Sequence, residues 1–586
     1  MAVESVLVAN RGEVAVRIVR ACRSLGLRSV AVYSDADAGA LHVRLADVAH
    51  RLGPAPARSS YLDVDALLAA AAAEAADAVH PGYGLLSEDA GFAAAVRDKG
   101  LVFVGPDPEV LATMGDKVAA RALARRCGVP VLEGTDSPVA AADGSLAATA
   151  AAVGFPLLVK AAHGGGGRGM RVVRGPDGLV DALAAASREA AAAFGRAEVF
   201  LERYLERPRH VEVQVLADGH GAVLVLGDRD CSVQRRHQKL LEEAPAPDLA
   251  PDLRAALAQA AVRLARQVGY RGAGTVEFLV DPAGGFAFLE MNTRLQVEHG
   301  VTEMVTGIDL VAAQLRIAAG TPLHLTPDDV VVRGHAIEAR VTAEDPWEGF
   351  RPTPGRVDTL RLPSGPWVRS DFGVEQGDVV PVEYDSLIGK VHAWGPDRDT
   401  ARTRLGLALD DLVIRGVPTT APHLRSVLDE PSFAAVEHDT GSLEREWEPD
   451  PAHRPASAPP ATAGEGGRRV QIATDRGPLI LSIPGRGPGT GTAVARGPGR
   501  EALPPGGGAS RAGDEPVAPM DATVVGVHVV AGNRVEAGDV LVVLEAMKME
   551  LPVRAARAAR VSEVRVSPGD AVAAGDELVV LGALSV

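Results

Sequence analysis

Over about the first 110 residues, short apolar runs alternate with stretches of helical periodicity. VLVAN, SVAVYS and LVFVGP are apolar runs of strand length, and RGEVAVRIVRACRSLG repeats its apolar positions every three to four residues. Strands that alternate with helices in this way are typical of a parallel sheet covered by helices. The turn ANRGEVAVR lacks the G-x-G-x-x-G spacing, so dinucleotide binding is only weakly indicated.

From residue 116 to 320 the pattern becomes mixed, with strand pairs around a Gly-rich turn. TVEFLV and GFAFLEMN are joined by DPAGG, which favours a hairpin with a loop at 282–285. Such a loop pairs Asp281 with Phe286 and places Glu277 opposite Glu290. The period of two also predicts one shared face of the second strand for Phe286, Phe288, Glu290 and Asn292.

The rest of the chain shows three further patterns. Residues 331–446 contain short strands and turns and a helical stretch, ARTRLGLALDDL. Residues 447–515 have the Pro- and Gly-rich composition of a flexible linker, with RRVQIAT and GPLILSI as a candidate hairpin. Near the C-terminus, GNRVEAGDVLVVL at 532–544 recurs as GDAVAAGDELVVL at 569–581. Two similar strand–turn–strand units predict a small, pseudo-symmetric all-β domain.

Length and composition restrict the class of protein. A chain of 586 residues predicts about three to five domains. No apolar stretch is long enough to span a bilayer, and the first residues lack a signal-peptide pattern. The three cysteines are far apart in sequence, which predicts neither disulfides nor a cysteine zinc site and favours the cytoplasm. The net charge of −16 argues against a non-specific nucleic-acid binder.

Lysine is rare in this chain. The sixty Lys and Arg positions include only six lysines: Lys99, Lys117, Lys160, Lys239, Lys390 and Lys548. An amine can be acylated and a guanidinium cannot, so these lysines are candidates for chemistry that arginine cannot perform. Lys548 lies between two methionines and midway between the two repeat units, where a hairpin tip is expected. The alternative is an ordinary solvated turn lysine.

Two elements favour nucleotide phosphates and a metal ion. KAAHGGGGRGM, from Lys160 onward, lets backbone amides approach phosphate oxygens, although a plain loop is as compatible and the Walker spacing is absent. In the predicted hairpin, Glu277 and Glu290 repel each other unless a cation lies between them. With Asn292 as a further oxygen ligand, Mg²⁺ is the expected ion, and an acidic surface hairpin is the alternative.

The sequence around Lys548, AMKM, resembles the biotinyl domain of biotin-dependent carboxylases, in which the lysine carries biotin through an amide bond. Lipoyl domains share that fold but typically have Asp-Lys-Ala at this point, so lipoate is the alternative. HPGYGLLSE, ERYLERPRHVEVQV, RDCSVQRRHQKLLEEAP, EMNTRLQVEH, GHAIEAR and YDSLIGK resemble biotin carboxylase, an ATP-grasp enzyme. This second resemblance extends from the first strand to about residue 446.

The resemblance implies a role for each motif residue. The nucleotide would contact Lys117, Lys160, Gly165, Gly166, Glu202, Leu205, His210, Gln234 and His237. Glu277, Glu290 and Asn292 would hold Mg²⁺ or Mn²⁺. Bicarbonate would be held by Lys239, Arg294, Gln296 and Val297, with Glu298 as its general base and Arg340 facing the ureido oxygen of biotin.

The resemblance also implies a division of the chain. It predicts an N-terminal α/β domain, an ATP-grasp α+β core with a Gly-rich lid, a mixed C-terminal subdomain, a flexible linker and an all-β biotinyl domain of the barrel-sandwich type. The corresponding ranges are 1–115, 116–330 with the lid at about 132–205, 331–446, 447–515 and 516–586.

The implied activity is that of an acyl-CoA carboxylase α subunit. ATP and bicarbonate would give carboxyphosphate, biotin on Lys548 would be carboxylated, and a separate carboxyltransferase β subunit would use it, as in fatty acid biosynthesis. A biotin protein ligase and a homo-oligomer within a larger complex are expected partners. The alternatives are part of a split pyruvate or urea carboxylase and a catalytically silent carrier or assembly protein. About 70 residues of linker cannot encode a carboxyltransferase, and the intact charged motifs argue against a silent protein.

Overall fold

The computed structural model describes residues 3–140, 144–162, 170–194, 196–451, 454, 468–474, 477–483, 516–520, 522–547 and 549–582. The chain divides into two units, the first made of residues 1–454 and 546–549 and the second of residues 455–545 and 550–586. Within the described ranges, every helix is too short or too polar to cross a membrane.

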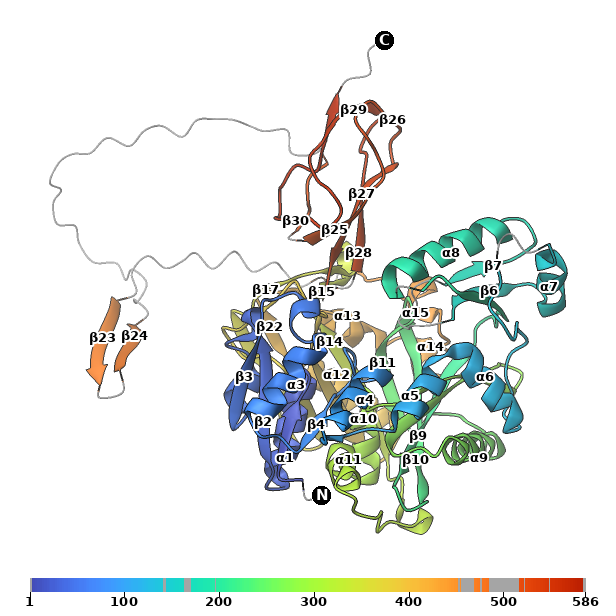
Figure 1. Cartoon of the computed structure of the whole chain (residues 1–586), viewed down its shortest axis with the longest axis vertical. Coiled ribbons are helices and arrows are strands. Elements are labelled where there is room, and N and C mark those ends of the chain that lie inside the picture. Colours follow the sequence, from blue (N-terminus) through green and yellow to red (C-terminus); the bar gives the residue numbers. More distant parts are fainter. Residues whose placement is uncertain are drawn as a thin grey trace. The chain divides into compact units, whose positions relative to one another are not determined.

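The first unit begins with a five-stranded parallel sheet in the order β3-β2-β1-β4-β5 (Figure 1). The strands are β1 (Ser5–Val8), β2 (Arg28–Ser34), β3 (Val48–Gly53), β4 (Ala78–His80) and β5 (Val102–Phe103). Val6 and Val8 pack against α1 (Gly12–Ser24) and α11 (Leu310–Ala318), whereas Leu7 packs against α3 (Val64–Ala73) and α4 (Ala90–Asp98). Helices cover both faces, which explains the continuous apolar runs and confirms the predicted parallel α/β sheet.

The centre of the unit is an eight-stranded sheet in the order β13-β12-β9-β10-β11-β14-β21-β19, with all neighbours antiparallel. Its strands are β9 (Arg209–Ala217), β10 (Val223–Arg235), β11 (Gln238–Ala244), β12 (Gly272–Val280), β13 (Phe286–Asn292), β14 (His335–Thr342), β19 (Val368–Phe372) and β21 (Leu387–Gly395). One face packs on α6 (Lys117–Arg126) and α9 (Pro251–Gln267) at one end and on α12 (Arg398–Asp411) at the other.

The hairpin of β12 and β13 differs from its predicted register. Val280 pairs with Phe286, so the loop is one residue longer than expected and Asp281 is outside the ladder. A β-bulge at Leu289 then shifts the register by one residue, and Glu277 lies opposite Glu290 as predicted.

The bulge also corrects the predicted faces of β13. Phe286 and Phe288 pair with Val280 and Phe278 on the apolar face, where all four pack in the core. Glu290 and Asn292 pair with Glu277 and Thr275 on the opposite, polar face. The prediction that the two phenylalanines share a face with Glu290 and Asn292 is therefore wrong, because a strict period of two cannot account for an extra residue.

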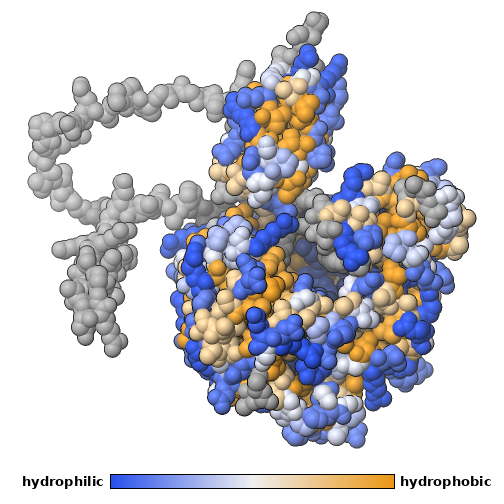
Figure 2. Space-filling view, in the orientation of Figure 1, coloured by the Kyte–Doolittle hydropathy of each residue, from blue (hydrophilic) through white to orange (hydrophobic). Residues whose placement is uncertain are grey.

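A smaller three-stranded sheet, β7-β6-β8, lies within the predicted lid range. Its elements are β6 (Leu157–Ala161), β7 (Arg171–Val173), β8 (Val199–Arg203), α7 (Leu146–Val153) and α8 (Leu179–Phe194), which enclose their own apolar core. Figure 2 shows a recess in the visible face of the first unit beside this region.

The C-terminal part of the first unit adds short elements around α12. These are β15 (Glu344–Asp345), β16 (Arg351–Pro352), β17 (Gly355–Arg356), β18 (Thr359–Arg361), β20 (Val379–Val380), β22 (Val413–Arg415), α13 (Ala421–Val427), α14 (Pro431–Ala434) and α15 (Ser442–Arg445). The strands form the antiparallel pairs β15/β16, β17/β20 and β18/β22.

In the predicted linker, β23 (Arg468–Thr474) and β24 (Gly477–Ile483) pair antiparallel, which confirms the hairpin, and most other linker residues lie outside the described ranges. The last ~70 residues form two small sheets, β28-β27-β25-β30 and β26-β29-β31, so the all-β prediction is confirmed. Their strands are β25 (Ala522–Val527), β26 (Arg534–Val535), β27 (Val540–Ala546), β28 (Met549–Arg554), β29 (Ala559–Val564), β30 (Ala571–Val572) and β31 (Val579–Gly582). We call these strands the carrier unit.

The carrier unit is pseudo-symmetric down to its backbone hydrogen bonds. Gly532 N donates to Val561 O at 2.8 Å, and 37 residues later Gly569 N donates to Val524 O at 2.7 Å. The turns repeat as well, because Asp539 Oδ2 accepts from Glu536 N at 2.8 Å and Asp576 Oδ2 from Ala573 N at 2.7 Å. Each half therefore completes the ladder of the other half.

Candidate functional site

The site residues lie on the polar face of the eight-stranded sheet. On β9, His210, Glu212 and Gln214 alternate with Val211, Val213 and Val215, which pack in the core beneath. The other strands follow the same period of two: Glu277 on β12, Glu338 and Arg340 on β14, and Lys390 on β21 point away from their apolar neighbours. The fold therefore gathers charged side chains from distant parts of the sequence onto one buried surface.

Lys239, near the start of β11, connects two of these carboxylates with that of Glu298, which precedes the next helix. Its Nζ donates to Glu212 Oε2 at 2.6 Å, to Glu277 Oε1 at 2.8 Å and to Glu298 Oε1 at 2.6 Å. Burial opposes the charged amine, but the three carboxylates raise the pKa of Lys239 well above its ordinary value. A small anion at this point would meet a cation that is held in place from three sides.

Glu298 lies between two cations and is completely buried. Besides Lys239, it accepts a hydrogen bond from Arg340 Nη2 at 3.0 Å. Burial opposes the charge, but Lys239 and Arg340 hold the pKa of Glu298 well below its ordinary value, so this carboxylate is ionised. Arg340 also donates through Nε to Glu242 Oε1 at 2.5 Å, and burial raises the pKa of Glu242 to about 8.

The residues predicted to hold a metal ion lie together at the β12–β13 end of the sheet. Glu277 Oε1 accepts from Asn292 Nδ2 at 2.7 Å, and His210 Nε2 lies 3.0 Å from Glu277 Oε2. Burial and the neighbouring Glu277 oppose the charge on Glu290, but its ion pair with Lys117 lowers the pKa of Glu290 below its ordinary value. Two carboxylates on paired positions fit a hard divalent cation, whereas the Asn292 amide presents its nitrogen to Glu277 and its oxygen to Arg294.

The residues predicted to contact nucleotide form a second group. Lys160, on β6, donates to Glu202 Oε2 on β8 at 2.8 Å, and burial lowers its pKa to about 7. Lys117 begins α6, whose first amides donate to Asp116 Oδ1 at 3.0 and 3.1 Å. Burial and the positive charge of Lys160 lower the pKa of His237, which is located in the β10–β11 turn.

The structure describes only some of the other residues that were predicted to contact nucleotide. Gln234 Nε2 lies 3.5 Å from His210 Nδ1, and Leu205 follows β8 with its side chain half-buried. Gly165, Gly166 and Lys548 lie outside the described residues. Met547, the residue before Lys548, has a φ of 51°, in the left-handed region that tight turns use.

The residues predicted to hold bicarbonate follow directly after β13. Arg294 donates through Nε to Glu88 Oε2 at 2.9 Å and through Nη1 to Gln296 Oε1 at 3.0 Å. Gln296 Nε2 in turn donates to Glu277 Oε1 at 3.0 Å, and the Val297 carbonyl accepts from Lys390 Nζ at 2.5 Å. The segment therefore links the metal candidates to Glu298.

Several site residues were not identified from the sequence. Glu212 contacts Lys239 and accepts from Arg229 Nε at 2.5 Å, and Arg229 also donates to Gln214 Oε1 at 2.8 Å while fully buried. Arg121 shares Glu202 with Lys160. The signal was present for β9, since HVEVQV alternates polar and valine positions in a strand that is buried on both faces.

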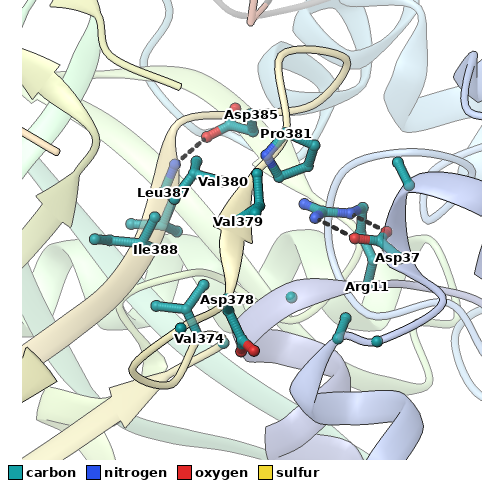
Figure 3. Close-up of a pocket in the computed structure, with 16 residues that line it drawn as sticks. Arg11, Asp37, Val374, Asp378, Val379, Val380, Pro381, Asp385, Leu387 and Ile388 are labelled. Atoms are coloured by element: carbon teal, nitrogen blue, oxygen red, sulfur yellow. Dashed lines mark hydrogen bonds and ion pairs between the residues drawn. The ribbon is translucent and has the colours of Figure 1, made fainter. Parts of the chain in front are cut away.

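A separate cavity of about 290 Å³ lies between the α1 end of the parallel sheet and the β20–β21 region. Arg11 donates through Nε and Nη2 to Asp37 at 2.7 and 2.8 Å, and Asp385 Oδ1 accepts from Leu387 N at 3.0 Å (Figure 3). None of the predicted site residues lines this cavity.

Four family profiles match the chain in succession. "Biotin carboxylase, N-terminal domain" matches residues 2–111, and "Carbamoyl-phosphate synthase L chain, ATP binding domain" matches residues 116–326. "Biotin carboxylase C-terminal domain" matches residues 338–445, and "Biotin-requiring enzyme" matches residues 516–581.

Individual proteins agree with these profiles. The chain is 45% identical to a biotin-dependent acyl-coenzyme A carboxylase alpha3 subunit from Mycobacterium leprae, over 94% of each chain. It is 51% identical to a biotin carboxylase from Nostoc sp., over 74% of this chain and 97% of that protein.

Solved structures match about three quarters of the chain. A biotin carboxylase complex from Campylobacter jejuni is 43% identical with a TM-score of 0.74, covering 76% of this chain and 99% of that one. The biotin carboxylase domain of a Hydrogenobacter thermophilus 2-oxoglutarate carboxylase, solved with MgADP and bicarbonate, is 42% identical with a TM-score of 0.74, covering 76% of this chain and 98% of that one.

Proposed function

The chain belongs to the biotin carboxylase family, as an alpha subunit of the biotin-dependent acyl-CoA carboxylase type, and from this premise we propose that it carboxylates biotin carried on its own Lys548. ATP and bicarbonate are the co-substrates. The observation that carries the proposal is the buried Glu298, ionised and held between Lys239 and Arg340.

Glu298 is the general base in this proposal. Bicarbonate attacks the γ-phosphoryl group of ATP, which releases ADP and forms carboxyphosphate, while Glu298 takes the bicarbonate proton. Without substrate, Lys239 and Arg340 keep Glu298 ionised, which is the form that accepts a proton. Bicarbonate bound at Lys239 and Arg294 would draw on the Lys239 charge and so raise the proton affinity of Glu298 at the moment of reaction.

Arg340 serves the second half of the reaction. Carboxyphosphate would decompose to CO₂ and phosphate. Biotin, when attached, would supply N1 as the nucleophile toward CO₂, with phosphate as the acceptor of the N1 proton. Arg340 places a fixed cation where negative charge develops on the ureido oxygen. Its guanidinium is fixed by Glu242 and Glu298, so little reorganisation is required.

The other predicted site residues would bind the nucleotide and the metal ion. Mg²⁺ or Mn²⁺ held by Glu277, Glu290 and Asn292 would neutralise phosphate charge during transfer. We assign the phosphates to Lys117, Lys160 and the glycine run that includes Gly165 and Gly166. Glu202, Leu205, His210, Gln234 and His237 would form the nucleotide pocket around them.

We also propose partner proteins, an oligomeric state and a cellular location for the chain. We infer that a separate carboxyltransferase β subunit takes the carboxyl group to an acyl-CoA, because the described site residues account only for biotin carboxylation. A biotin protein ligase would load Lys548, and the chain would form homo-oligomers in an α–β complex. The three cysteines are unpaired, which supports a reducing cytoplasm.

The role of Glu298 is tested by ATP cleavage in the presence of free biotin. We expect the purified chain to form ADP only when bicarbonate is present. Glu298→Gln should lower this rate by roughly 10²-fold or more, since it removes the base, and should change nucleotide affinity little. Glu437→Gln, the same change at an exposed position, is the control. Intact bicarbonate-dependent cleavage in Glu298→Gln would contradict the assignment.

A further inference from the structure

Lys390 is a fully buried lysine with no part in the chemistry above. It is located on β21 directly opposite Arg340 of β14, and its other cross-strand neighbour is Asp371 of β19. A buried ammonium must be paired to be tolerated. Its partners therefore indicate its function.

The ammonium of Lys390 joins two segments that are far apart in sequence. Nζ donates to the Val297 carbonyl at 2.5 Å and lies 3.0 Å from Glu13 Oε1 in the first turn of α1. Glu13 also accepts a hydrogen bond from Tyr83. Burial opposes the charge, but Glu13, Glu338 and Asp371 raise the pKa of Lys390, so it remains a charged donor.

The contact with Val297 matters because Glu298 is the next residue. Glu298 is the N-cap of α10 (His299–Thr306), so its backbone is the junction between the bicarbonate segment and that helix. A charged hydrogen bond to the preceding carbonyl fixes the peptide that joins Val297 to Glu298.

The neighbouring residue on the same face of β21 supports the start of α10. His392 Nε2 lies 2.6 Å from Glu338 Oε2, and both side chains are fully buried. The ring packs so closely on α10 that a Cβ atom at Gly300 would come within 2.2 Å of His392 Nε2. Strand β21 therefore supports the chain on both sides of Glu298.

We propose that Lys390 is a positioning residue, which holds the Val297 carbonyl so that the Glu298 carboxylate and the bicarbonate site keep their geometry. This inference rests on the proposed function of Glu298. Lys390 does not touch the reacting atoms. Its effect should appear in bicarbonate use and not in nucleotide binding.

The test separates positioning from charge balance. Lys390→Met removes the donor but leaves Glu13 buried without its cation, which destabilises the fold. The double variant Lys390→Met/Glu13→Gln removes both charges and should regain most of the lost Tm. Both variants should raise the KM for bicarbonate by about 10- to 100-fold, because the hydrogen bond to Val297 is absent in both. The KM for ATP should stay within about twofold of wild type.

Lys99→Met makes the same change at an exposed lysine and should match wild type in both constants. A bicarbonate KM that returns to wild type in the double variant would show that Lys390 only balances charge, and the proposal would fall. An unchanged bicarbonate KM in Lys390→Met would have the same consequence. Wild type is measured first: without bicarbonate-dependent ATP cleavage there, the proposed function itself fails.

Discussion

At the scale of single residues, the first unit tolerates many buried charges because most are paired, as Arg229 is with Glu212 and Lys390 with Glu13. Glu344 is an exception. It is buried on β15, accepts a hydrogen bond from Ser386 Oγ, and burial raises its pKa to about 7. A carboxyl group in this position is stable in its neutral form.

We expect Glu344 to make stability depend on pH. Its pKa is about 7 in the folded chain against an ordinary value of 4.5, so the folded state binds more protons between these values. Stability should therefore fall as pH rises from about 4.5 to 7 and stay level above that. Because glutamine stays neutral, the free energy of unfolding of Glu344→Gln should rise relative to that of wild type as pH increases from about 4.5 to 7. The rise should be at most about 3 kcal/mol.

Thermal unfolding of the two proteins at pH 5.5 and pH 8 measures this difference. Glu437→Gln, at an exposed position, should show no such gain. An equal Tm difference between Glu344→Gln and wild type at both pH values would show that Glu344 is ionised in the folded chain.

The sequence predicted which residues belong to the candidate site better than it predicted which residues they contact. The pairing of Glu277 with Glu290 was predicted although the hairpin register was not, because the longer loop and the bulge at Leu289 offset each other. The contact of Lys390 with Val297 spans 93 residues and depends on how β21 and the start of α10 meet in the fold. Alternation in β9 indicated that Glu212 faces away from the valines, but it did not indicate which cation would meet it.

At the scale of elements, the hydrophobic pattern predicted which segments form strands and which form helices. It did not predict every strand register. The parallel sheet, the β23–β24 hairpin and the repeat of the carrier unit were all predicted. The bulge at Leu289 was not, because it depends on the packing of Phe288 against one face and the placement of Glu290 on the other.

The bulge leads to a prediction about deletions. Removing Leu289 leaves Phe288 opposite Phe278 and Glu290 opposite Glu277, so both faces keep their residues. We expect this variant to bind Mg²⁺–ATP within about tenfold of wild type. Removing Met291 instead turns Asn292 toward the apolar face and should abolish binding. Calorimetric titration with Mg²⁺–ATP measures the affinity of both variants. An equal loss of affinity in the two would show that the bulge itself shapes the site.

At the scale of the whole molecule, most residues of the carrier unit belong to a different unit from the candidate site residues. The composition of residues 447–515 predicts a flexible linker, and a coil of ~70 residues has an average reach of about 40–50 Å, which would let Lys548 visit more than one site.

This arrangement predicts where label from bicarbonate will appear. With ATP and Mg²⁺, the biotinylated chain should retain label on itself, and Lys548→Arg should retain none while remaining folded. Acetyl-, propionyl- and longer acyl-CoA should acquire label only after a carboxyltransferase subunit is added. Label in acyl-CoA without that subunit would contradict the two-subunit proposal, and label on Lys548→Arg would contradict the carrier assignment.

The exchanged hydrogen bonds of the carrier unit have a further consequence. Because Gly532 bonds to the strand of one half and Gly569 to the strand of the other, neither half has a complete ladder alone. The two halves must form in one cooperative step. A backbone cut between β27 and β28 would leave two fragments that hold each other through these exchanged hydrogen bonds, so the covalent link between the halves is not what keeps the domain together.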